Sequence, residues 1–201
     1  MYLIIKRIFD IIISLIVLSI LLIPLIFISI CIIIDSGYPV FYLQERIGLG
    51  WSQFKIIKFR TMVRNADKIG PGLSLNNDKR VTYVGKILRR FKIDEIPQLV
   101  NVLLGDMSLI GPRPELKKFA IHYSKEYSEI LTIKPGITDF ASLEFINESL
   151  MLDDKPETEK FYINEILPKK ISLCKKYLAE MNLQTDLKII FKTACGLISC
   201  K

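Results

Sequence analysis

The sequence predicts a mostly helical α+β protein with two parts, a membrane-embedded helix over residues 1–36 and a small soluble domain over residues 37–201. The stretch from Ile8 to Ile34 is almost wholly apolar, as a membrane helix requires. Residues 39–44 and 54–62 are short β-branched and aromatic runs separated by glycine turns, which predicts a β-hairpin. Apolar residues recur at helical spacing in several later stretches, so the rest of the domain is expected to be helical.

The amino-acid composition supports a membrane segment joined to a soluble body. Of the 201 residues, 50% are hydrophobic and 24% are charged, a mixture that neither part alone would show. The four cysteines, Cys31, Cys174, Cys195 and Cys200, form no C-x-x-C pair and no Cys/His metal pattern. We therefore expect reduced thiols in a cytoplasmic protein and assign them no chemistry.

The net charge of +7 is unevenly distributed along the chain. Residues 40–92 hold twelve Lys or Arg against three acidic residues, whereas residues 93–201 carry a net charge of −2. The basic excess follows the apolar segment directly, which suits membrane lipid headgroups or phosphorylated substrates. Nucleic acid is the rival partner for a basic patch, but a membrane-tethered chain without a nucleic-acid motif predicts none. The oligomeric state stays open, and a homo-oligomer is compatible with these features.

The apolar segment allows two topologies. As one straight helix it would measure roughly 40 Å, enough for a tilted single span of the ~30 Å hydrocarbon core. Pro24 removes a helical hydrogen bond and predicts a kink, which leaves limbs too short to cross alone. Lys6 and Arg7 precede the segment and the basic region follows it, so both flanks favour the cytoplasmic face. A re-entrant helix that enters, kinks and returns satisfies both observations, while hydropathy alone favours the single span.

The stretch from Lys92 to Glu115 carries the candidate chemistry. Asp94 and Glu95 precede Pro97 and a short apolar run that Gly105 is expected to end, so a helix should begin beside the acid pair. Carboxylates or phosphates are favoured at such a helix start, although an Asp there is usually only a cap. Arg113 lies between two prolines, which restrict the backbone and present the guanidinium to a phosphate or simply form a stiff turn.

Further helices are predicted over residues 81–91, 114–131, 156–167, 168–181 and 186–198. The first is basic and amphipathic, which suits either a membrane interface or packing on the core. Residues 65–80 form a polar loop, either a lid over a substrate or a plain surface loop, and residues 134–138 a turn. Lys58 and Arg60 are either solvated charges of a strand or ligands of phosphate oxygens.

Several motifs resemble the signature of the bacterial sugar transferase family, the monotopic polyprenyl-phosphate phosphoglycosyl transferases. They are Gln44-x-Arg46-x-Gly48, Lys58-Phe-Arg60-Thr-Met, Asp94-Glu95-Ile-Pro-Gln-Leu, Asn101-Val, Gly105-Asp106-Met-Ser and Gly111-Pro-Arg-Pro. The resemblance covers essentially the whole chain, and it is strongest over residues 40–138. It implies a re-entrant helix kinked at Pro24 and a catalytic domain on the cytoplasmic face of the bacterial inner membrane.

The sequence departs from the family's pattern in two places. Ile23 stands where members often carry Ser before the kink proline. The run from Asp139 to Glu144 replaces the family's usual Gly and Ala-Gln-Val-like residues. We expect this second region to contact the variable part of the donor, so the departure bears on the identity of the sugar and leaves the reaction type intact.

The resemblance implies transfer of a sugar 1-phosphate from a UDP-sugar to undecaprenyl phosphate, with release of UMP, as the initiating step of bacterial surface glycan assembly. It assigns Asp94 as a covalent nucleophile that also contacts Mg²⁺ and Glu95 as its acid/base or orienting partner. Phosphate oxygens would be bound by Arg113, Arg89, Lys58 and Arg60. The residues alone equally allow direct transfer with both acids serving the metal, and a non-catalytic membrane scaffold is the remaining hypothesis.

Overall fold

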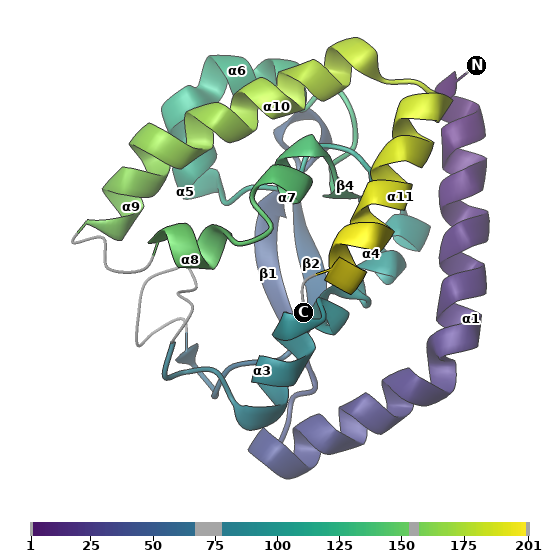
Figure 1. Cartoon of the computed structure of the whole chain (residues 1–201), viewed down its shortest axis with the longest axis vertical. Coiled ribbons are helices and arrows are strands. Elements are labelled where there is room, and N and C mark those ends of the chain that lie inside the picture. Colours follow the sequence, from purple (N-terminus) through teal and green to yellow (C-terminus); the bar gives the residue numbers. More distant parts are fainter. Residues whose placement is uncertain (1, 67–77, 153–156, 200–201) are drawn as a thin grey trace.

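The computed structural model describes residues 2–66, 78–152 and 157–199. Within these ranges helices enclose a small β-hairpin, and the long helix α1 (Tyr2–Ser36) forms one outer edge (Figure 1). The predicted mostly helical α+β fold is therefore confirmed. Most of the polar loop predicted over residues 65–80 lies outside the described residues, so its interpretation as a lid stays a prediction.

The hairpin consists of β1 (Phe41–Ile47) and β2 (Gln53–Phe59), which pair antiparallel from Phe41↔Phe59 to Ile47↔Gln53. A 3₁₀ turn, Leu49–Trp51, joins the strands, and Gly50 in it has φ 60°, a conformation that glycine adopts without strain. Both strands begin and end within three residues of the predicted boundaries. The β-branched and aromatic composition and the glycine turn were thus a sufficient signal for this pair.

Helix α4 (Gln98–Leu104) is fixed against β2 through one buried side chain. The side-chain oxygen of Asn101 accepts a hydrogen bond from Ile57 N at 2.9 Å, and its amide nitrogen donates to Lys55 O at 2.8 Å. Asn101 therefore pairs with the strand as another backbone amide would. Gly105 ends the helix with φ 94°, as the sequence predicts.

A second pair of strands was not predicted. β3 (Ser108–Ile110) and β4 (Gly136–Thr138) pair in parallel, and β4 occupies the stretch predicted as a turn. Strands of three residues are too short to show an alternating pattern, and their pairing depends on contacts between distant segments. The backbones of Gly111 and Gly136 approach each other closely beside this pair of strands. A Cβ atom added to Gly136 would lie only 2.1 Å from Gly111 N.

We expect Gly136→Ala to lower the free energy of unfolding by at least about 2 kcal/mol, because the methyl group would overlap backbone atoms that cannot rotate away. Gly196→Ala is the matched control. Gly196 lies within α11 (Leu183–Ser199), and a Cβ atom added to it would meet its nearest atom at 3.8 Å, which is an ordinary contact. The higher helix propensity of alanine should therefore raise the free energy of unfolding by about 0.5–1 kcal/mol. Urea unfolding of both variants measures the difference, and equal stabilities would contradict the close approach.

Three of the predicted helical stretches are helical in the structure, but one of them is not a single helix. α3 (Tyr83–Arg90) is capped by Thr82, whose side chain accepts from Gly85 N, and α11 covers the last predicted helix. The single helix predicted over residues 114–131 is wrong. It is broken into α5 (Lys117–Ala120), a 3₁₀ turn and α6 (Ser124–Ile130), because the backbone leaves the helical region at Tyr123.

The two helices predicted on either side of Pro168 are wrong as separate elements. α9 (Thr158–Phe161), a π-helical turn (Tyr162–Ile166) and α10 (Leu167–Glu180) follow without a break. Pro168 lies in the first turn of α10, where a missing N–H is tolerated. Two short helices, α7 (Phe140–Glu144) and α8 (Glu148–Leu152), had no prediction.

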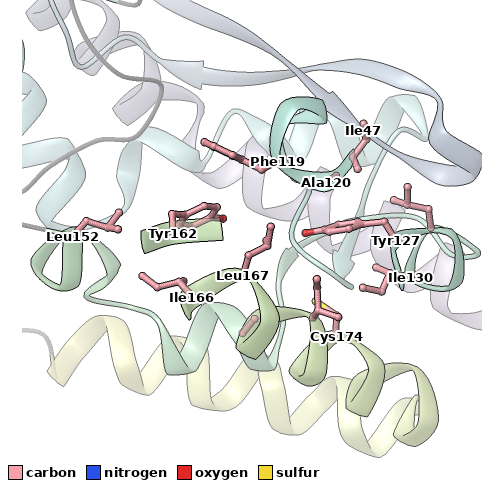
Figure 2. Close-up of a cluster of buried hydrophobic side chains, with 13 residues drawn as sticks. Ile47, Phe119, Ala120, Tyr127, Ile130, Leu152, Tyr162, Ile166, Leu167 and Cys174 are labelled. Carbon is pink, nitrogen blue, oxygen red and sulfur yellow. The ribbon is translucent and has the colours of Figure 1, made fainter. Parts of the chain in front are cut away.

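The main hydrophobic cluster lies between α10 and the α5–α6 segment, and Figure 2 shows its side chains. Tyr162 and Phe119 contact each other with ring centroids 4.9 Å apart, and Leu167 is fully buried beside them. Ile47 extends this cluster to the end of β1. The core thus joins the hairpin to the C-terminal helices and fixes the wall of the cavity described below.

Helix α1 is bound to the domain near both of its ends. Toward its start, Lys6 Nζ lies 2.7 Å from Asp186 Oδ2, and Arg7 donates to Val102 O at 2.6 Å. At its end, Ser36 Oγ accepts from Arg60 at 2.8 Å. Fifteen large apolar residues of α1 remain exposed. Within the described part of the chain, α1 is the one helix that is long and apolar enough to cross a membrane.

This double attachment bears on topology. A straight helix of 35 residues would separate its ends by roughly 50 Å, and a helix that crosses a bilayer places them on opposite sides. Figure 1 shows α1 bent, and Pro24 lies inside it. One small domain contacts residues near both ends, which favours the re-entrant helix. The division into residues 1–36 and 37–201 stays a prediction.

We expect both ends of α1 to lie on the same side of the membrane. A cysteine placed ahead of Met1 and a second variant, Tyr38→Cys, would be made in a background without native cysteines. In intact cells both should resist an impermeant external thiol reagent and react after permeabilisation. Labelling of either position from outside would restore the single-span topology.

Candidate active site

The acid pair lies in a tight turn between α3 and α4. Lys92 has φ 55°, a left-handed conformation that costs a non-glycine residue about 1–2 kcal/mol. A 3₁₀ turn, Ile93–Glu95, follows it and precedes α4. The helix expected beside the acid pair is α4, which begins three residues after Glu95. Backbone strain of this kind is commonly retained at functional positions.

Glu95 is held by two cations. Lys58 Nζ lies 2.8 Å from Glu95 Oε1, and Arg113 pairs with both carboxylate oxygens. Burial alone would raise the pKa of Glu95, but the charges of Arg113 and Lys58 and their hydrogen bonds outweigh it and hold the pKa well below its usual range. The same carboxylate raises the pKa of Arg113. Glu95 is therefore ionised and immobile at neutral pH.

Asp94 has the opposite character. Its side chain is buried, and among the described residues its Oδ1 has no hydrogen-bond partner. Burial and the neighbouring Glu95 raise the pKa of Asp94, against the opposing charges of Lys58 and Arg89. Two adjacent carboxylates whose environments push their pKa values apart are a common arrangement for split roles. Asp94 is therefore the less stabilised anion of the pair.

The two remaining predicted cations, Arg89 and Arg60, have different partners. Arg89 donates from Nε to Thr61 Oγ1 at 2.7 Å, and burial lowers its pKa while the charge of Asp94 raises it, so Arg89 lies near Asp94. Arg60 instead holds the end of α1 through Ser36 Oγ and Gly37 O. Its electrostatic neighbours are Arg64 and Asp35. The structure thus brings Asp94, Glu95, Lys58, Arg89 and Arg113 together, whereas Arg60 lines the same cavity but is bound to the end of α1.

These side chains line a cavity of about 1430 Å³. Typical sites for one small molecule occupy roughly 300–1,000 Å³, so the cavity is larger than a site for one small molecule usually is. It extends from Tyr38 and Pro39, directly after α1, past the acid pair to Tyr162 and Lys170. The structure also brings to its wall four residues that the sequence did not single out, Glu115, Glu148, Tyr162 and Lys170. No motif or periodicity marked them, because they come from separate segments.

The site accommodates a hard divalent cation only through Asp94 and substrate oxygens. The described residues contain no group of three or more His, Cys, Asp or Glu placed to hold a metal. Glu95 is occupied by its two cations, whereas Asp94 Oδ1 is buried without a partner. One carboxylate completed by phosphate oxygens and water is the usual protein contribution to a Mg²⁺ site. The donor set therefore fits Mg²⁺.

Comparison with known proteins identifies the family of the chain. A family model for the bacterial sugar transferases matches residues 1–199. The chain belongs to this family. As a bacterial sugar transferase it shares 37% identity over 169 residues with the UDP-N-acetylgalactosamine-undecaprenyl-phosphate N-acetylgalactosaminephosphotransferase of Aeromonas hydrophila, covering 82% of this chain and 37% of the relative.

Two further relatives of this bacterial sugar transferase match nearly all of its length. The UDP-glucose:undecaprenyl-phosphate glucose-1-phosphate transferase of Caulobacter vibrioides is 34% identical over 96% of this chain and 70% of its own length. The exopolysaccharide production protein PSS of Rhizobium leguminosarum is 34% identical over 96% of this chain and 94% of its own length. The named sugars differ between relatives of similar identity, so overall identity does not select one.

Proposed function

We propose that the chain transfers a sugar 1-phosphate from a UDP-sugar to undecaprenyl phosphate at the cytoplasmic face of the bacterial inner membrane. UMP is the leaving group, and the lipid-linked product starts the assembly of a surface glycan. One observation carries the proposal. The cavity that contains Asp94 reaches the end of the apolar helix at Tyr38 and Pro39, so a lipid phosphate and a water-soluble donor can meet at one carboxylate.

In the first step a carboxylate oxygen of Asp94 attacks the donor phosphorus that carries the sugar. The bond to the oxygen that bridges the two phosphates breaks, and UMP leaves with that oxygen. In the second step a phosphate oxygen of the lipid attacks the same phosphorus and releases the Asp94 carboxylate. Each step displaces one oxygen by another, so no redox partner is needed.

The surrounding residues position and neutralise the phosphates. Arg113 and Lys58 carry charge toward the cavity while Glu95 fixes their orientation, and Arg89 adds a cation near Asp94. Because the pKa of Glu95 is held low, an orienting role suits it better than proton transfer, and the anionic acceptor needs no base. Mg²⁺, when bound, would neutralise the diphosphate charge. Arg60 is a further candidate phosphate ligand, because it lines the cavity.

Direct transfer with both acids as metal ligands is the second candidate. The two ion pairs of Glu95 count against it, because that carboxylate would have to leave Arg113 and Lys58 to reach a metal. A scaffold without activity would have no use for a buried carboxylate oxygen that lies in a cavity and has no hydrogen-bond partner within the described part of the chain.

The test is UMP release from a panel of UDP-sugars in the presence of undecaprenyl phosphate and Mg²⁺. We expect turnover with one donor or a small group of donors. Absence of UMP release with every donor, from protein that unfolds cooperatively on heating, would contradict the proposal. Measurable affinity for nucleic acid at physiological salt would favour the rejected nucleic-acid hypothesis instead.

A further inference from the structure

A second polar cluster lines the cavity away from the acid pair. Lys170 Nζ, on α10, lies 2.5 Å from Glu148 Oε2, on α8, and 3.2 Å from the hydroxyl of Tyr162. That hydroxyl in turn donates to Glu115 Oε2 at 2.5 Å. The side chains of Lys170 and Glu148 are 14% and 27% exposed, whereas Tyr162 is buried. Glu148 and Lys170 are therefore the members of this cluster that a bound molecule can reach.

An aromatic side chain adjoins the accessible pair. Lys170 Nζ lies 5.9 Å from the centroid of the Phe145 ring, and Phe145 also lines the cavity. A paired donor and acceptor beside an apolar ring can bind the hydroxyl groups and the apolar face of a sugar. A carboxylate can accept several hydrogen bonds and an ammonium group can donate several. Both can therefore bind a substrate while they remain paired.

The cluster is connected to the phosphate-binding arginine. Glu148 and Asp139 are the carboxylates that, after Glu95, most raise the pKa of Arg113. Asp139 Oδ2 also accepts from the backbone N–H of Arg113 at 3.3 Å, and its Oδ1 caps α7 through Ser142 N at 2.7 Å. Arg113 thus lies between the acid pair and this second cluster. A donor whose diphosphate binds Arg113 can extend one end toward Glu148.

We propose that Glu148 and Lys170 select the sugar of the donor by hydrogen bonding to its hydroxyl or acylamino substituents. The inference rests on the proposed function and names the residues that determine its specificity. The sugar fits better than the uridine, because uridine is common to all these donors while the relatives differ in sugar. Glu148 also follows the Asp139–Glu144 stretch, where this sequence departs from its family's pattern, by four residues, and Lys170 lies against Phe145, directly after that stretch.

The test compares Glu148→Gln and Lys170→Gln with the wild type on pairs of UDP-sugars that differ at one carbon, such as UDP-glucose and UDP-galactose, or their N-acetylated forms. Glu159→Gln is the matched control, because its ion pair with Lys118 is 44–49% exposed and neither residue lines the cavity. The ratio of kcat/KM between the two donors, the inhibition constant of UMP and the Tm are measured for each protein. Using both variants keeps the test decisive if one of them fails to fold.

We expect the ratio between preferred donor and epimer to fall at least tenfold in the two cavity variants, since a lost hydrogen bond to a substrate hydroxyl removes discrimination. The inhibition constant of UMP should change less than threefold, and the Glu159→Gln control should match the wild type in all three measurements. An unchanged ratio, or a UMP constant that rises with the donor KM, would overturn the inference. Failure of the wild type to use any UDP-sugar would instead overturn the proposed function.

Discussion

Asp94→Asn is expected to lower turnover at least about a thousandfold and to abolish any covalent intermediate, because the amide keeps the shape of the side chain but cannot attack phosphorus. UMP release measured against the wild type tests this loss. A variant that retains more than a tenth of wild-type activity would exclude Asp94 as nucleophile.

The same substitution should make the protein more stable. Burial and Glu95 raise the pKa of Asp94, so the folded state binds the proton more tightly than the unfolded state. Between the ordinary and the raised pKa the stability therefore falls as the pH rises, and the cost of the buried charge is fully present above that window. Asparagine removes the charge. Chemical denaturation at neutral pH should show a higher unfolding free energy for Asp94→Asn, and a lower one would contradict the assigned direction.

Glu95→Gln is expected to have the opposite effect on stability and a similar effect on function. It would leave Lys58 and Arg113 without their partner, which should cost about 2–4 kcal/mol after allowance for the partial exposure of Arg113. The phosphate-binding cations would lose their fixed positions, so turnover should fall at least about a hundredfold. Denaturant unfolding and UMP release measure the two effects.

The pH dependence of the unfolding free energy distinguishes the loss of these ion pairs in Glu95→Gln from a general packing defect. The pKa of Glu95 is lowered on folding, so its contribution is present above the ordinary carboxyl pKa and is lost as the pH falls toward the lowered value. The stability difference between wild type and Glu95→Gln should therefore shrink in acid. Glu45→Gln, on the exposed face of β1, is the control and should change stability by less than about 0.5 kcal/mol. A difference that is constant with pH would contradict the ion-pair account.

The sequence was sufficient wherever the signal is local. The hairpin, α3, the glycine end of α4 and the apolar α1 all follow from periodicity, capping and turn residues within one segment. The family motifs likewise marked Asp94, Glu95 and Arg113 before any contact was known. Their assigned roles as nucleophile, partner and phosphate ligand stay predictions that the variants above address.

The sequence was insufficient where tertiary contacts decide. The parallel pair of β3 and β4 joins segments separated by more than twenty residues, and no pattern within either one shows it. The bidentate pairing of Arg113 with Glu95 depends on the same long-range packing. Glu148 and Lys170 meet only because α8 and α10 border one cavity. In each case the residue type was visible in the sequence and its partner was not.

The most direct test of the central claim is the reaction of the wild type with its UDP-sugar and Mg²⁺ before any lipid acceptor is added. The account predicts a burst of UMP that approaches one equivalent per active site, an intact-protein mass raised by one phosphosugar, and a modified peptide that contains Asp94. A fully active enzyme that shows neither the burst nor the adduct would contradict the covalent route and favour direct transfer.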